Sequence, residues 1–164
     1  MKYLFAVFIL LAAPAARSQS MFEAIRAEWH FYVFVSSTMP RESLIQIARD
    51  AQKSRAVIVL RGMGEGQNGM VASRDFAAGI NTQCCSGNPP AWMIHPALFD
   101  RYKVKSAPAF VVAKGEGTGS DDFSLVYGDV GIPAALKFIA QTSKNSATRA
   151  QSSSIYIRSF GSKY

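Results

Sequence analysis

The stretch FYVFVSSTMPRESLIQIA, residues 31–48, decides the fold of this chain. It begins with aromatic and β-branched residues, which are typical of a β-strand. Its last part places Leu44, Ile47 and Ala48 on one face, which predicts an amphipathic helix. A short polar elbow, residues 36–40, joins these two elements. The sequence therefore predicts a strand that turns directly into a helix, and many proteins carry their reactive groups at such a junction.

Strands and helices alternate along the rest of the chain. This order predicts a mostly parallel sheet flanked by helices. The last two strands are too close together for a crossover, so they must pair antiparallel. The predicted class is α/β, with a mixed, mostly parallel central sheet, a C-terminal antiparallel strand pair and a closing helix. We expect strands at 31–36, 56–62, 91–96, 105–114 and 123–130, helices at 21–29, 40–53, 71–80, 96–104 and 132–141, and irregular segments at 63–70 and 81–91.

The two ends of the chain differ from this domain, which we expect to span residues 20–142. Residues 1–18 hold one early lysine, an apolar run and then small residues, which is the layout of a secretory signal peptide. The apolar run is shorter than the roughly 20 residues that cross a bilayer. No acidic residue follows Asp129, and residues 143–164 are basic and low in apolar content. We expect export to the periplasm and a flexible basic tail at 143–164.

The two cysteines, Cys84 and Cys85, are neighbours in the sequence. Neighbouring Cα atoms lie about 3.8 Å apart, which is below the usual range of roughly 4.4–6.8 Å for a disulfide. The chain therefore cannot close an ordinary loop with a disulfide of its own. Three states remain open: a strained ring between the neighbours, a bond to another molecule, or two free thiols. His30 and His95 do not complete a metal-binding spacing with them, so no metal site is expected.

The segment LFDRYKVKSAPAFVV, residues 98–112, leads from a helical turn into a strand through a proline. Proline has no N–H to donate to a sheet, so it belongs at the first residue of a strand. This arrangement resembles thioredoxin-fold proteins, in which that proline is cis and faces the strand-helix elbow across a shallow groove. The resemblance implies that Pro108 is cis and that Ala107 and Pro108 form one side of such a groove.

The elbow lacks the residues that thioredoxin-like redox chemistry needs. A redox member of that superfamily has C-x-x-C there, and the start of the helix stabilises the thiolate. Here the positions hold Ser37, Thr38, Met39 and Pro40, and a serine hydroxyl does not exchange disulfides. Disulfide exchange at the elbow is therefore excluded. We expect Ser37 or Thr38 to cap the helix instead.

A glycine-rich segment, GEGQNG at residues 64–69, follows the second expected strand. It matches the spacing of dinucleotide-binding loops, but Glu65 places a negative charge where a pyrophosphate would lie. We interpret it as a flexible turn and expect no cofactor. Arg61, at the strand end just before it, could hold an anion or a carboxylate, or make a local hydrogen bond.

Four segments in this order resemble the TrbC family of type-F conjugative transfer systems: FYVFVSSTMP, VIVLRGM, MIHPALFDRYKVKSAPAFVV and VYGDV. The similarity covers roughly residues 30–140. It implies an exported, thioredoxin-like protein without the redox pair, which acts in assembly of the conjugative pilus beside the partner protein TraW. His95 precedes Pro96 where the family commonly has an aspartate, and the adjacent cysteines and the basic tail are not part of the family pattern.

These observations predict a periplasmic, non-catalytic assembly factor for an F-type conjugative pilus or type IV secretion system. Its groove would bind an extended segment of a TraW-like protein or another pilus or secretion-channel component, without nucleic acid or a small-molecule substrate. Two alternatives stay open: a periplasmic thiol-disulfide oxidoreductase or isomerase that uses Cys84 or Cys85, and a generic peptide-binding module. The residues expected to bind the partner are Ser37, Thr38, Met39, Pro40, Arg61, Ala107 and Pro108.

Overall fold

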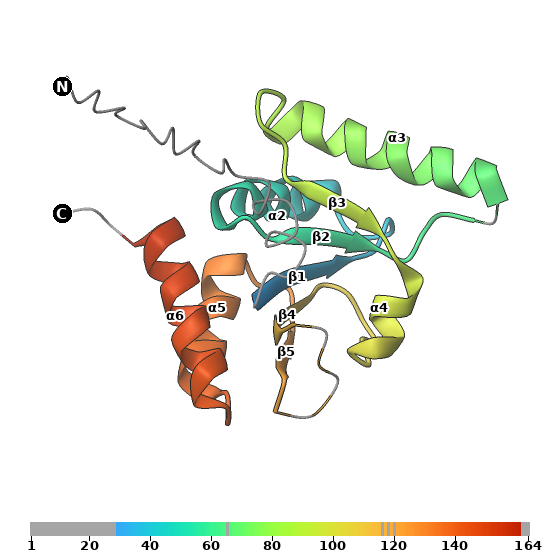
Figure 1. The fold of residues 1–164 in the computed structure, drawn as a ribbon. Coiled ribbons are helices and arrows are strands. Elements are labelled where there is room, and N and C mark those ends of the chain that lie inside the picture. Colours follow the sequence, from blue (N-terminus) through green and yellow to red (C-terminus); the bar gives the residue numbers. More distant parts are fainter. Residues whose placement is uncertain (1–28, 65, 116, 118, 120, 162–164) are drawn as a thin grey trace, which may run out of the picture.

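A five-stranded sheet in the order β3-β2-β1-β4-β5 forms the centre of the molecule (Figure 1). The computed structural model describes residues 29–64, 66–115, 117, 119 and 121–161. The expected signal peptide at 1–18 and most of the helix expected at 21–29 lie outside these residues, and Trp29 begins the first strand. The strands are β1 (Trp29–Val35), β2 (Val57–Leu60), β3 (Ala91–Ile94), β4 (Ala109–Lys114) and β5 (Phe123–Tyr127); the helices are α2 (Arg41–Ser54), α3 (Gly66–Cys84), α4 (Pro96–Arg101), α5 (Ile132–Thr142) and α6 (Ser146–Phe160).

The strand directions confirm the predicted mixed sheet. β1, β2 and β3 run parallel, because a helix carries the chain back after β1 and again after β2. β4 pairs antiparallel with β1, and β5 pairs antiparallel with β4. The predicted C-terminal strand pair and closing helix are therefore present as β4, β5 and α5.

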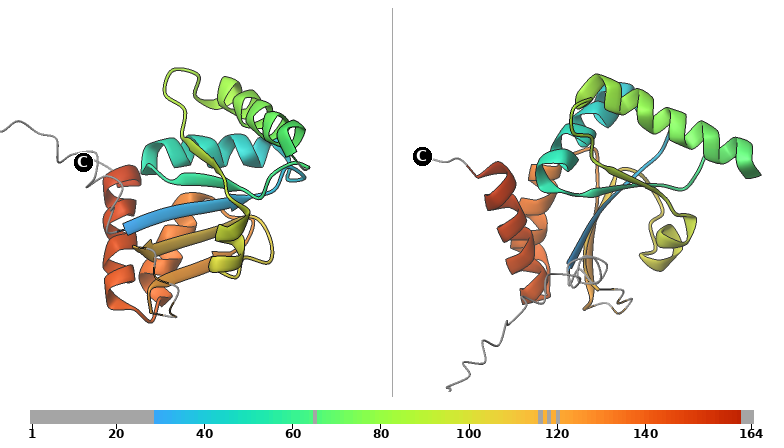
Figure 2. Two further views of the ribbon diagram at one scale, coloured as in Figure 1. Left: turned by 45° about the vertical axis from the view of Figure 1, so that its right-hand side comes forward. Right: turned by 45° about the horizontal axis from the view of Figure 1, so that its top comes forward.

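Side chains of β1 alternate between two hydrophobic clusters, one on each face of the sheet. Val33 and Val35 pack with buried residues of α2, α5 and α6, whereas Tyr32 and Phe34 pack with α4. Successive side chains of a strand point to opposite faces, so a strand that is apolar throughout must be covered on both. Figure 2 shows this layering, with α5 and α6 side by side at one end of the molecule.

Helix α3 is longer at both ends than the sequence predicts. It includes Gly66–Gly69 of the expected glycine turn and ends at Cys84, within a segment expected to be irregular. The Ser73 hydroxyl donates to the Gly69 carbonyl (2.7 Å) and accepts the Met63 N–H (2.9 Å), which fixes the start of the helix. A Cβ atom at Gly69 would lie 2.5 Å from the Gly64 oxygen, so this close turn requires a glycine. The glycines therefore allow a tight helix start here.

The flexible tail expected at 143–164 is wrong over most of its length, because residues 146–160 form α6. The Asn145 side chain caps this helix by accepting the N–H groups of Ala147 and Thr148. Thr148, Ser152 and Ile155 are buried, and α6 packs against α5 and α2. Small polar side chains face the neighbouring helix, so low apolar content does not indicate disorder here. Among the described residues, no helix has the length and apolar character needed to cross a membrane.

Candidate functional site

The elbow between β1 and α2 is a tight turn that leaves its hydroxyl groups at the surface. The Met39 N–H donates to the Ser36 carbonyl (3.2 Å), and the Ser36 and Thr38 hydroxyls are hydrogen-bonded at 2.8 Å. The expected cap by Ser37 or Thr38 is wrong: Pro40 occupies the N-cap position of α2, and no side chain caps the helix. Ser37 and Thr38 precede the N-cap position by three and two residues, so neither occupies the position from which a side chain normally caps a helix.

The chain enters β4 through a cis peptide bond between Ala107 and Pro108, as expected. The Pro108 carbonyl accepts the Gly128 N–H (3.3 Å), which ties this bond to the end of β5. Just before it, the Tyr127 hydroxyl donates to the Lys103 carbonyl (2.9 Å) and accepts the Lys105 N–H (3.1 Å). The loop that enters β4 is therefore fixed at both ends.

Between these anchors, residues 106 and 107 keep their backbone groups open. In the part of the chain that the structure describes, no hydrogen bond is made by the backbone of Ser106 or Ala107. Ser106 is exposed and Ala107 is half-buried. A fixed backbone with unpaired N–H and C=O groups is the feature to which an extended peptide can add as a further strand.

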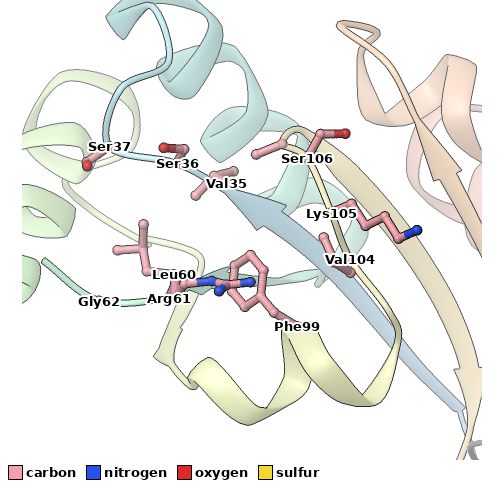
Figure 3. A pocket seen from close by; sticks show the side chains of 11 residues that line it. Val35, Ser36, Ser37, Leu60, Arg61, Gly62, Phe99, Val104, Lys105 and Ser106 are labelled. Atoms are coloured by element: carbon pink, nitrogen blue, oxygen red, sulfur yellow. The ribbon is translucent and has the colours of Figure 1, made fainter.

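A cavity of about 400 Å³ lies between the elbow, the end of β2, α4 and the loop into β4 (Figure 3). It brings together three of the seven predicted partner-binding residues, Ser37, Arg61 and Ala107. These come from three separate segments that meet where the parallel strands end. The full lining is Val35, Ser36, Ser37, Leu60, Arg61, Gly62, Phe99, Val104, Lys105, Ser106 and Ala107.

The other four predicted residues do not line this cavity. Met39 packs against the core cluster beneath α2, and its sulfur accepts the Ser36 N–H (3.4 Å). Pro108 is buried, while Thr38 and Pro40 are exposed outside the lining. The sequence pattern places these residues in the correct segments, the elbow and the loop before β4. It does not determine the direction in which each side chain points.

Arg61 is held against an aromatic ring rather than by a hydrogen bond. Its guanidinium carbon lies 4.8 Å from the centre of the Phe99 ring (Figure 3). Phe99 is 6% exposed and packs edge-to-face on Phe34, with 4.8 Å between the ring centres. Sequence reasoning missed Phe99, because a buried apolar residue on a short helix looks like any other core residue. It also missed Lys105 and Ser106, which are exposed residues of the loop that enters β4.

Cys84 and Cys85 form a disulfide between neighbouring residues, the first of the three states that the sequence leaves open. Neither lines the cavity. Cys85 is 9% exposed and packs in the cluster on the α2 face of the sheet, whereas Phe99 and Val104 of the cavity belong to the cluster on the α4 face. Among the described residues, no three His, Cys, Asp or Glu side chains come together as metal ligands.

The sheet order, the strand-helix elbow and the cis proline just before β4 define a thioredoxin-like domain whose elbow holds serine and threonine instead of cysteine. The chain belongs to the family of type-F conjugative transfer system pilin assembly proteins, whose model matches residues 33–139. No curated protein matches the chain. Among solved structures, it is similar to a secreted Mycobacterium tuberculosis disulfide oxidoreductase homologous to E. coli DsbE, with 13% identity and a TM-score of 0.41 over 81% of this chain and 84% of that one.

Proposed function

We propose that this protein is a periplasmic, non-catalytic assembly factor that binds an extended segment of a partner protein in the cavity beside the elbow. The family gives the process, which is assembly of the pilus of a type-F conjugative transfer system. The partner is a protein of the same system, a TraW-like protein or another component of the pilus or secretion channel. The signal peptide expected at residues 1–18 would deliver the domain to the periplasm.

The open backbone at Ser106 and Ala107 is the observation that carries this proposal. An extended segment that lies along these residues can exchange main-chain hydrogen bonds with them, as in strand addition. The elbow forms the opposite side, where Ser36 and Ser37 present hydroxyl groups. Main-chain hydrogen bonds of this kind can form with a segment of any sequence. The specificity of binding would therefore come from the partner side chains that enter the cavity.

The same site lacks the means to react with what it binds. A serine needs an adjacent general base to become a nucleophile, and no hydrogen bond to the Ser37 hydroxyl exists within the described residues. Cys84 and Cys85 pack in the cluster on the α2 face of the sheet and do not line the cavity. The domain would therefore hold a segment and release it unchanged.

A bulky side chain at Ser37 tests this proposal. Ser37→Trp should fill the cavity and weaken binding of the partner segment at least about tenfold, which corresponds to roughly 1.4 kcal/mol of binding free energy. The frequency of conjugative transfer should fall as a result. Ser86→Trp is the matched control, because Ser86 is also exposed and lies outside the cavity lining. Transfer is measured between donor and recipient cells, and thermal unfolding of the purified proteins shows that both variants are folded.

A photo-reactive amino acid beside the cavity identifies the neighbour directly. Thr38 is exposed, adjoins Ser37 and lies outside the lining, so a bulky residue at this position leaves the cavity open. Incorporated at position 38 in donor cells, p-benzoylphenylalanine should cross-link to a protein of the transfer system, and at position 86 it should not. If Ser37→Trp is folded and transfers at the level of the unmodified protein, the cavity is not the binding site.

A further inference from the structure

We infer that the partner segment carries a carboxylate and that Arg61 binds it. This inference rests on the proposed function, because it names the chemistry of the segment that the cavity holds. It follows from how Arg61 is positioned, from the charges around it and from the kind of ligand that can fit beside an open backbone.

The position of Arg61 is set before any ligand binds. It follows Leu60, the last residue of β2, and precedes Gly62, whose φ of 115° is a conformation that favours glycine. Its guanidinium group lies over the Phe99 ring, which the core holds in place. A guanidinium stacked in this way keeps the N–H groups along its edge available, and these form the fork that matches a carboxylate.

Among the described residues, no acidic side chain forms an ion pair with this arginine. None of the residues that line the cavity is acidic, and neither Arg61 nor Lys105 makes an ion pair within the described part of the chain. Arg74, by contrast, pairs with Asp75 at 3.0 Å. Figure 3 shows the Lys105 side chain extending away from Arg61, so it adds positive charge at the rim without filling the cavity.

The rest of the lining favours a peptide carboxylate over a phosphate-rich ligand. Val35, Leu60 and Val104 add apolar side chains to the lining, and of its two cations only Arg61 is stacked on an aromatic ring, while Lys105 extends away from it. A single guanidinium fork binds one carboxylate in a bidentate manner. The open backbone of Ser106 and Ala107 can pair with the peptide groups of a ligand. The ligand that satisfies these conditions is an extended segment with an aspartate, a glutamate or a free C-terminus.

Mapping of the cross-link at position 38 tests the inference. The full-length protein with p-benzoylphenylalanine at position 38 is cross-linked in donor cells, and mass spectrometry identifies the captured partner peptide. We expect an aspartate, a glutamate or the C-terminal residue of the partner within a few residues of the cross-link. Changing that acid to its amide, or extending the partner chain beyond its C-terminus, distinguishes the two sources of the carboxylate.

Substitution of Arg61 supplies the second measurement. Arg61→Gln should lower the cross-link yield at least about tenfold, because it removes the charge and the fork that would hold the carboxylate. Arg61→Lys should recover part of the yield, because it keeps the charge and loses the fork. Arg49→Gln, at an exposed arginine on α2 outside the lining, should leave the yield unchanged.

The outcomes separate the two proposals. If position 38 still captures a partner but the peptide has no carboxylate, or Arg61→Gln gives the original yield, the carboxylate inference is overturned and the proposed function stands. If position 38 captures no protein of the transfer system, both are overturned. An equal loss from Arg61→Gln and from the partner's acid-to-amide change, without further loss in the double variant, would show that the two groups contact each other.

Discussion

The elbow and the cysteine pair lie in different parts of the molecule, whereas a thiol-disulfide enzyme has its cysteines at the elbow. The elbow has the shape: a turn with exposed hydroxyls, and a cavity of about 400 Å³ between this turn and the loop that enters β4 through the cis Ala107–Pro108 bond. The end of α3 has the sulfur, with Cys84 and Cys85 joined and packed against the core. Because the sulfur atoms do not line the cavity, a segment held there meets an arginine and hydroxyl groups rather than a thiol. This separation is the physical reason to expect binding without disulfide exchange.

On the elbow side of this comparison, the cavity depends on the core beneath it. Phe34→Ala tests this dependence and should have the largest effect on the free energy of unfolding. Phe34 is fully buried and supports the Phe99 ring beneath Arg61. Truncating a buried phenylalanine costs about 3–5 kcal/mol, so denaturant unfolding should show a loss of that size. Phe34→Leu, which keeps most of the volume, should cost far less. A loss below about 1 kcal/mol for Phe34→Ala would mean that the ring is not the rigid support inferred here.

The double substitution Cys84→Ala and Cys85→Ala tests the other half of the comparison, with a smaller effect. A disulfide between neighbours closes almost no loop, so its removal relaxes the unfolded chain very little. The main cost is one buried sulfur, at Cys85, and should be about 1 kcal/mol in denaturant unfolding. We expect transfer between cells to stay at the level of the unmodified protein. A folded double variant that fails to transfer would favour the thiol-disulfide alternative.

Much of the fold is visible in the sequence because its signals are local. The strand, elbow and helix of residues 31–48 and the proline before β4 were predictable from residue type and spacing alone. The longer α3 was not, because Gly69 serves a close backbone approach that spacing does not reveal. The helix α6 was missed because Thr148 and Ser152 form its buried face, and small polar residues normally indicate a solvated segment.

The candidate site was predictable only where a residue lies at the end of a strand. Arg61 follows β2, and Ala107 precedes β4, so both meet at the edge where the cavity opens. Met39 was assigned to the partner surface, but it packs into the core. Phe99 comes from a different element, and its role under Arg61 depends on tertiary packing. Residue patterns along one segment carry no information about such contacts between segments.

Hydroxyl groups give the finest test of the comparison, because those of the elbow are exposed and those of α6 are buried. Thr148 is 0% exposed, and its Oγ1 has no hydrogen-bond partner within the described residues. An unsatisfied buried hydroxyl costs about 1–3 kcal/mol, and valine has the same shape without it. Thr148→Val should therefore raise the free energy of unfolding by about 1 kcal/mol.

The matched change at the elbow is Ser37→Ala, which should alter stability by no more than about 0.5 kcal/mol because the Ser37 hydroxyl is exposed to water. Both variants are compared by denaturant unfolding under the same conditions. If Thr148→Val destabilises the protein, the hydroxyl has a partner, and the α5–α6 contact contains water or a bent helix turn. If Ser37→Ala is costly instead, the elbow hydroxyls stabilise the turn and are not free to contact a bound segment. The two results together decide whether the buried hydroxyl of α6 destabilises the fold and whether the exposed hydroxyl of the elbow is free of any role in stability.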